Sequence, residues 1–305
     1  MLSHCWGDAS FIKLVTRDLP RFKEGLSLDQ LPKSFVDAIA VAMFLNVRYI
    51  WIDSLVILQD NTEDWAYEAS CMELVYKNSV CNIGATASKD SNGGLFFKRM
   101  PETLLPHRWM LEGVKYELNW VNSSSQDWVR SVEEQPLMRR GWVVQERWLC
   151  PRMLHFCKEQ VYRECRAMNG CEAFPHMDGT VVSLKSGRHN VAYSQWRKLV
   201  RFYSSCNLTF QKDKVVAFSG IAKEIQRESN DVYLAGLWKT TSYTIWLGKH
   251  WGKILTGFGS AHKSILRRLG PGRRVSVSSL TRPVFLGTTK TERCFPSFRL
   301  YPTSI

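Results

Sequence analysis

The side chains best suited to chemistry are Trp142 and Glu146, which lie four residues apart in the run Arg-Gly-Trp-Val-Val-Gln-Glu-Arg. That spacing places both on one face of a helix, with the indole as a wall beside the carboxylate. An aromatic wall can pack the ring of a ligand. The carboxylate could stabilise a positive charge that develops during a reaction, or orient water. Glu146 is therefore the candidate catalytic residue.

Further polar side chains follow two predicted strands. Ser3 and His4 come at the end of the first strand, and Asp53 and Ser54 at the end of the second. Because ligands bind beyond the carboxyl ends of the strands in open α/β sheets, we expect these side chains to meet Glu146 in one crevice. Two arginines could bind phosphates there bidentately. The candidate ligand-binding residues are thus Ser3, His4, Trp6, Asp53, Ser54, Arg140, Trp142 and Arg147.

The same residues have a structural interpretation. Glu146 could pair with one of the two neighbouring arginines, Asp53 could cap the turn that follows it, and the tryptophans could belong to the core. His4 alone is weak evidence for acid–base chemistry, because the sequence identifies no partner for it. The sequence leaves both interpretations open.

Several other site types lack their required parts. There is no glycine-rich phosphate loop, no H-E-x-x-H and no G-x-S-x-G, which excludes nucleoside-triphosphatase, metalloprotease and serine-hydrolase classes. The nine cysteines form no C-x-x-C pair, so we interpret them as free thiols and predict no metal. A metal held by Cys157, Cys165, Cys171, His155 and His176 is the alternative. The alternation in His-Phe-Cys at 155–157 favours a half-buried strand instead.

Alternating strands and helices predict the framework that holds these residues. We expect strands at 2–5, 49–53 and 80–87, with helices at 34–46 and 63–77 between them. Ser34 and Asp37 could cap the first helix, and Asn46 can adopt the left-handed conformation that ends it. The segment 49–53 is apolar on both faces, as in a buried central parallel strand. This order predicts an α/β fold with a parallel sheet wrapped by helices.

Later elements are predicted less completely. We expect a helix at 140–147, strands at 153–156 and 160–164, and amphipathic helices at 193–203 and 217–228. No firm element is assigned to 95–135, and the patterns fade after Trp251.

Composition describes a folded chain with an unusual end. Of the 305 residues, 45% are hydrophobic, but no run of apolar residues is long enough for a membrane-spanning helix. Residues 1–7 do not form a secretion signal. We therefore expect a cytoplasmic location. Much of the net charge of +13 lies after Phe258, where nine basic residues accompany one acid. A solvated, poorly ordered tail is the favoured interpretation, and contact with nucleic acid or anionic lipid the alternative.

Three separated blocks carry a family resemblance. They are Leu-Ser-His-Cys-Trp-Gly at 2–7, the segment from Tyr-Ile-Trp-Ile-Asp-Ser-Leu at 49–55 to Tyr76, and 140–147 continuing to Pro-Arg at 151–152. In this order they resemble the motifs of the fungal heterokaryon incompatibility (HET) domain. Residues up to Trp238 resemble the segment that follows that domain. The sequence departs from the family pattern in two places. Val56 stands where the family commonly has cysteine. The chain also starts at the first motif, so we expect a truncated first strand.

The resemblance implies a function and a more specific fold. HET domains are similar in layout to Toll/interleukin-receptor (TIR) domains, which implies a flavodoxin-like, mainly parallel sheet. We expect a HET domain at 1–165, a helical extension at 166–257 and the basic tail at 258–305. The resemblance implies fungal non-self recognition and programmed cell death, through self-association and a separate sensor protein. TIR enzymes carry Trp-Cys-x-x-Glu, so Trp142 and Glu146 also imply an alternative, hydrolysis of NAD as substrate with no cofactor required.

Overall fold

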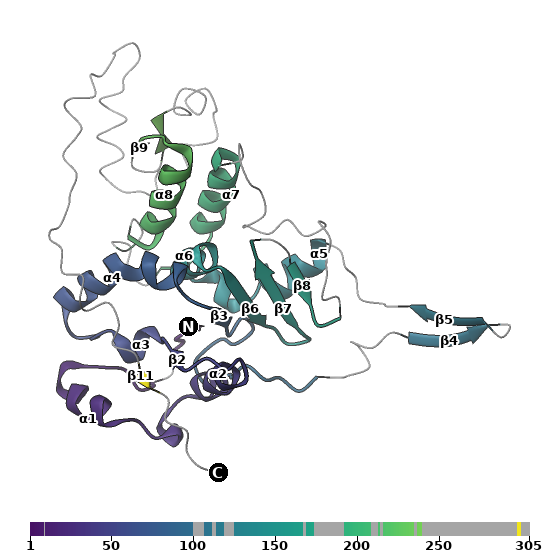
Figure 1. Cartoon of the computed structure of the whole chain (residues 1–305), viewed down its shortest axis with the longest axis horizontal. Helices are drawn as coiled ribbons and strands as arrows, with labels where there is room; N and C mark the ends of the chain where they lie inside the picture. The colour runs from purple at the N-terminus through teal and green to yellow at the C-terminus, as the bar shows by residue number, and fades with distance from the viewer. Residues whose placement is uncertain are drawn as a thin grey trace.

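The computed structural model of the chain describes residues 1–8, 10–99, 107–111, 114–118, 125–166, 169–173, 192–208, 213, 216–234, 237–239 and 298–299. A five-stranded sheet in the order β1-β3-β6-β7-β8 organises the fold (Figure 1). Its strands are β1 (Leu2–Ser3), β3 (Asn82–Gly84), β6 (Arg152–Phe156), β7 (Val161–Cys165) and β8 (Asn169–Cys171). The mixed α/β class predicted from the sequence is confirmed.

The sheet is only half parallel, which corrects the expectation of a mainly parallel sheet. Strand β3 pairs in parallel with β1 and β6, with Leu2 opposite Ile83 and Ile83 opposite Leu154. Strands β6 to β8 are antiparallel, with His155 opposite Tyr162. The four residues between β6 and β7 are too few for a crossover, so they can join only antiparallel neighbours.

The predicted central strand at 49–53 is also corrected. It shortens to β2 (Tyr49–Ile50), which is not one of the five strands. The amide of Leu2 donates to the carbonyl of Trp51 at 3.0 Å, so the segment that follows β2 lies beside β1 at the margin of the sheet. Tyr49 is 47% exposed for this reason. Asp53 opens a short helix, α3 (Asp53–Val56).

Helix α2 (Lys33–Phe44) ends as predicted and begins differently. Asn46 has φ 54°, and the amides of Asn46 and Val47 donate to the carbonyls of Met43 and Ala42, both at 2.9 Å. These are the two bonds of a Schellman motif. At the other end Pro32 is the N-cap, and the predicted capping residues serve a neighbouring loop instead: Ser34 Oγ accepts from the Gly94 amide and Asp37 Oδ2 from the Leu95 amide.

The predicted helices of the C-terminal extension pack directly on the sheet domain. Helices α7 (Ala192–Ser204) and α8 (Val216–Ser229) share one hydrophobic cluster with Val144 of α6 (Gly141–Leu149). Gln145 Oε1 accepts a hydrogen bond from the Gly220 amide at 2.9 Å. Figure 1 shows α7 and α8 beyond α6, on the side of the sheet away from α2. The extension therefore fixes the face of α6 that it covers.

The remaining elements surround this framework. Helix α4 (Thr62–Lys77) confirms the second predicted helix and is capped by Asn61, which accepts from the amides of Glu63 and Asp64. The others are η1 (Thr16–Asp18), α1 (Leu19–Glu24), η2 (Leu28–Gln30), β4 (His107–Leu111), β5 (Val114–Leu118), α5 (Ser125–Trp128), η4 (Val129–Glu133), η5 (Pro136–Arg139), β9 (Tyr233–Leu234), β10 (Leu237–Trp238) and β11 (Phe298–Arg299). Within the described ranges no helix has the length and apolar character needed to cross a membrane.

Two residues of the predicted basic tail form a strand. Strand β11 pairs antiparallel with β2, with Phe298 opposite Ile50. The rest of 258–305 lies outside the described residues, as does His176 of the alternative metal cluster.

Candidate functional site

Glu146 lies between α6 and the sheet and contacts the first predicted strand. Its buried carboxylate accepts a hydrogen bond at Oε2 from Ser3 Oγ on β1. Asn82 on β3 donates from Nδ2 to the same hydroxyl at 2.9 Å. The residues Glu146, Ser3 and Asn82, which we call the Glu146 cluster, thus join α6 to the two adjacent parallel strands. This contact between the first and third sequence blocks was predicted.

Burial dominates the electrostatics of Glu146. Removal from water raises the pKa of its carboxyl group from 4.5 to about 7. The positive charge of Arg140 and the hydrogen bond from Ser3 lower the pKa, while the negative charge of Asp53 raises it. Neither arginine neighbour forms a salt bridge with Glu146 among the described residues. Glu146 can therefore hold a proton up to near-neutral pH.

Three polar groups lie close to the Asp53 carboxylate. Trp6 Nε1 donates to Oδ2 at 3.2 Å, and the Ser54 amide donates to Oδ1 at 2.7 Å. His4 Nδ1 lies 4.0 Å from Oδ1. Burial lowers the pKa of His4 to about 4, with Asp53 opposing this shift and Arg140 adding to it. His4, Trp6 and Asp53, which we call the Asp53 cluster, include a neutral imidazole next to a carboxylate.

Ser3 and His4 point to opposite sides of the sheet, so the expected single crevice does not bring the His4 ring to Glu146. Successive residues of an extended chain point to opposite faces. Ser3 therefore meets α6, whereas the His4 ring packs edge-on against Phe35 of α2 at 4.9 Å. Figure 1 shows α6 and α2 on opposite sides of β3. Arg140 connects the clusters, because its Nη1 donates to the His4 carbonyl and its charge acts on Glu146.

Arg147 has a structural role in place of the predicted phosphate contact. Its guanidinium is fully buried and binds Glu164 twice, through Nε at 2.7 Å and Nη2 at 3.1 Å. Nη2 also lies 3.5 Å from Glu133, and the ring of Trp128 lies 5.6 Å from the guanidinium carbon. His155 Nε2 shares the Glu164 carboxylate at 3.1 Å. A phosphate could reach this arginine only by displacing a buried carboxylate.

Most of the other candidate ligand-binding residues pack against neighbouring side chains. Trp142 is half-buried and meets Trp65 edge-on at 6.3 Å, as its structural interpretation predicted. Ser54 is buried, and its Oγ has no hydrogen-bond partner within the described part of the chain. Trp6 remains half-exposed, with Lys13 Nζ 4.7 Å above its ring.

Asn82 is the site residue that the sequence reasoning missed. It lies in the strand Val-Cys-Asn-Ile-Gly-Ala, where it is the single amide among small and apolar residues. A buried polar side chain needs a hydrogen-bond partner, and Asn82 finds its partner in Ser3. That interruption of an apolar strand was the available signal.

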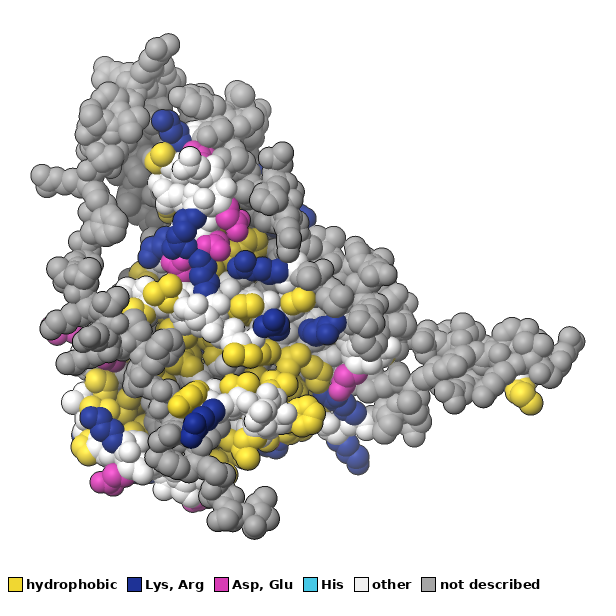
Figure 2. Space-filling view, viewed as in Figure 1, with side chains coloured by type: hydrophobic (Ala, Val, Ile, Leu, Met, Phe, Trp, Pro, Cys, Tyr) yellow, Lys and Arg dark blue, Asp and Glu magenta, His cyan; other side chains and the backbone are white. Residues whose placement is uncertain are grey.

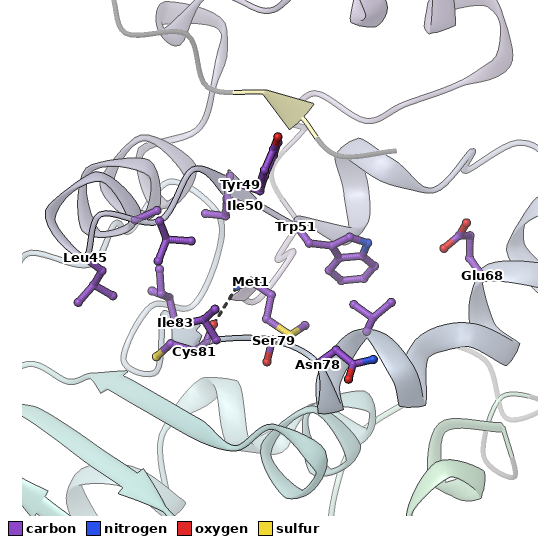
Figure 3. Close-up of a pocket in the computed structure, with 14 residues that line it drawn as sticks. Met1, Leu45, Tyr49, Ile50, Trp51, Glu68, Asn78, Ser79, Cys81 and Ile83 are labelled. Atoms are coloured by element: carbon purple, nitrogen blue, oxygen red, sulfur yellow. Dashed lines mark hydrogen bonds between the residues drawn. The ribbon is translucent and has the colours of Figure 1, made fainter. Parts of the chain in front are cut away.

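Neither cluster lines the hollow that opens beside β2. This hollow of about 230 Å³ lies between α2, β2 and α4, and Met1, Trp51 and Glu68 are among its lining residues (Figure 3). No group of three or more His, Cys, Asp or Glu side chains among the described residues could hold a metal ion.

Comparison with known proteins gave one match. Residues 1–146 match the family model described as Heterokaryon incompatibility protein (HET). No curated protein and no solved structure matches the chain.

Proposed function

We propose, for a chain whose residues 1–146 belong to the heterokaryon incompatibility (HET) family, that it acts in fungal non-self recognition and programmed cell death. In this proposal a separate sensor protein detects the non-self partner, and copies of the chain then assemble in the cytoplasm to pass on the signal. The proposal requires a surface through which copies can associate.

An exposed hydrophobic surface supports the proposal. It consists of Met43, Phe44, Leu45, Tyr49 and Val80, and we call it the α2–β2 surface. Their exposed fractions run from 40% for Leu45 to 89% for Phe44. Figure 2 shows hydrophobic side chains gathered over the region that α2 and β2 occupy in Figure 1. Contiguous apolar patches of this kind mark interaction sites on folded proteins.

Replacing Met43 and Phe44 by serine is expected to prevent assembly and cell death without unfolding the chain. Both side chains are largely exposed, at 62% and 89%, so the folded state loses little buried area. An interface that buries them would lose central apolar contacts, which weakens association roughly tenfold or more. Assembly is measured by light scattering of the purified protein. Cell death is measured by the viability of fungal cells that express it.

Met110→Ser with Val232→Ser is the matched control. These residues are also exposed, at 74% and 43%, but lie on β4 and near β9, away from the α2–β2 surface in Figure 1. The control should assemble and kill like the unaltered chain. Equal assembly and equal toxicity in Met43→Ser/Phe44→Ser would refute this surface as the site of association.

A TIR-like NAD glycohydrolase is the second candidate, and the Glu146 cluster favours it. The segment that follows β2 lies beside β1, which is followed by β3 and β6, and this sequence of neighbours is similar to the strand order of a flavodoxin-like sheet. Such sheets bind ligands at the point between β1 and β3. Ser3 and Asn82 come from these two strands and meet at Glu146. The ionised carboxylate would stabilise the oxocarbenium-like state formed when the nicotinamide–ribose bond breaks.

Under this alternative, Glu146→Gln should abolish NAD loss in expressing cells while leaving the protein folded. Glutamine keeps the shape and a hydrogen bond to Ser3 but carries no negative charge, and removal of a catalytic carboxylate typically lowers turnover by about a hundredfold or more. The exposed Glu159→Gln is the control. Unchanged NAD during cell death caused by the unaltered chain excludes the hydrolase and leaves assembly as the mechanism.

A further inference from the structure

Strand β2 has a partner from a distant part of the chain. Strand β11 pairs with it in antiparallel register, with Phe298 opposite Ile50 and Arg299 opposite Tyr49. On the other side, the segment that follows β2 is tied to β1 by the backbone bond from Leu2 to Trp51. Without β11, β2 would present a row of unpaired N–H and C=O groups. An exposed strand edge of that kind pairs readily with another strand.

The hollow described above opens beside the same strand. Its volume is about 230 Å³, and its lining is mainly apolar, with Leu45, Tyr49, Ile50 and Trp51 among the lining residues. Figure 3 shows β11 passing Tyr49 at the margin of this hollow. A segment that adds to a sheet edge gains affinity from backbone hydrogen bonds, and it gains selectivity from pockets for its alternate side chains. Strand β2 and the hollow have both features.

The hollow has one acidic side chain in its lining. Glu68 is half-buried in the hollow, where burial and then the charge of Asp64 raise the pKa of its carboxyl group. A positive charge nearby would relieve this unfavourable environment. The chain after Phe258 has nine basic residues and one acid. Its C-terminal segment therefore has the charge that the hollow favours.

We propose that β2 and the hollow form a docking site for the chain's own C-terminal segment, which adds β11 to β2 as an intramolecular cap. Leu45, Tyr49 and Val80 of the α2–β2 surface also line the hollow, so the cap covers the margin of that surface. The cap and a second copy then compete for the same edge. This competition, though not the cap itself, rests on the proposed function.

Hydrogen exchange at residues 49–51 tests the cap. Phe298→Pro with Arg299→Pro removes the two backbone donors of β11, so exchange should become about tenfold faster or more. Thr289→Pro with Lys290→Pro adds the same prolines and removes the same charge, and it should leave exchange unchanged. A synthetic peptide of residues 295–303, added to the uncapped variant, should restore slow exchange.

Two results would overturn the cap. One is equal exchange at residues 49–51 in the unaltered chain and in Phe298→Pro/Arg299→Pro. The other is protection in the unaltered chain that disappears on dilution, because the paired strand would then come from a second copy.

Light scattering of the same variants tests the competition. Phe298→Pro/Arg299→Pro should assemble at concentrations where the unaltered chain is monomeric. Faster exchange without a change in mass supports the cap and counts against the α2–β2 surface as the assembly site. Unchanged exchange refutes the cap, while the Met43→Ser/Phe44→Ser experiment still decides the proposed function.

Discussion

Replacing Arg147 by methionine is expected to cost about 3–5 kcal/mol of the free energy of unfolding, the loss typical when one partner of a buried ion pair is removed. Glu164 is fully buried, and Arg147 supplies two of its hydrogen bonds. Methionine would leave that carboxylate with His155 but without its main positive charge. Urea denaturation measures the loss, and most single domains retain only 5–15 kcal/mol.

Two further variants distinguish the loss of the buried ion pair between Arg147 and Glu164 from the loss of an arginine side chain alone. Arg152→Met changes an exposed arginine whose Nη1 donates to the Val80 carbonyl at 3.3 Å, and it should cost about 1 kcal/mol or less. Arg147→Met combined with Glu164→Gln removes the buried charge and should recover part of the loss. If Arg147→Met were as stable as Arg152→Met, the guanidinium would be free to bind a ligand, as the sequence suggested.

Glu146→Gln is expected to stabilise the fold at neutral pH and to remove a pH dependence. Below about pH 4.5 the carboxyl is protonated in both the folded and the unfolded chain, so it causes no loss of stability. Between pH 4.5 and about 7 the unfolded chain ionises first, because burial raises the folded pKa to about 7. Stability is therefore lost as the pH rises through this interval, by about 3 kcal/mol in all.

The measurement is the difference in unfolding free energy between Glu146→Gln and the unaltered chain at pH 5 and at pH 8. His4 acts in the opposite direction, since its lowered pKa costs stability as the pH falls, but it contributes equally to both proteins. The advantage of glutamine should grow from pH 5 to pH 8. A constant difference would show that Glu146 titrates as an exposed carboxyl does, and it would remove the proton-holding role from the Glu146 cluster.

Local patterns were sufficient to predict the longer helices, but not the short helices α1, α3 and α5. The apolar stripe and Asn46 predicted the body and the end of α2, and the acidic start of 63–77 predicted α4. These features depend on residues within one or two turns of each other. The predicted capping by Ser34 is wrong, because the helix begins at Lys33 with Pro32 as its N-cap. The side chains of Ser34 and Asp37 instead accept hydrogen bonds from the amides of Gly94 and Leu95. These two amides are distant in sequence.

The strand at 49–53 shows where such patterns fail. Its apolar residues predicted burial on both faces, which is wrong for one of them. Ile50 and Ile52, which share one face, are buried, whereas Tyr49 on the other face is 47% exposed. The strand's position at the margin beside β1, and its partner β11, depend on pairing between segments up to about 250 residues apart. An apolar pattern indicates that a strand is buried, but it does not identify which segment packs against or pairs with that strand.

The sequence was sufficient to predict the family of residues 1–146, the mixed α/β class, the positions of the longer helices and the contact between Ser3 and Glu146. It did not predict that His4 points away from Glu146, that Arg147 binds Glu164, or that residues 298–299 pair with β2. The difference arises because helix periodicity and caps depend on contacts within a few residues. Which face a side chain reaches, and which charge meets it there, depend on strand pairing over long separations, and no short pattern encodes that pairing.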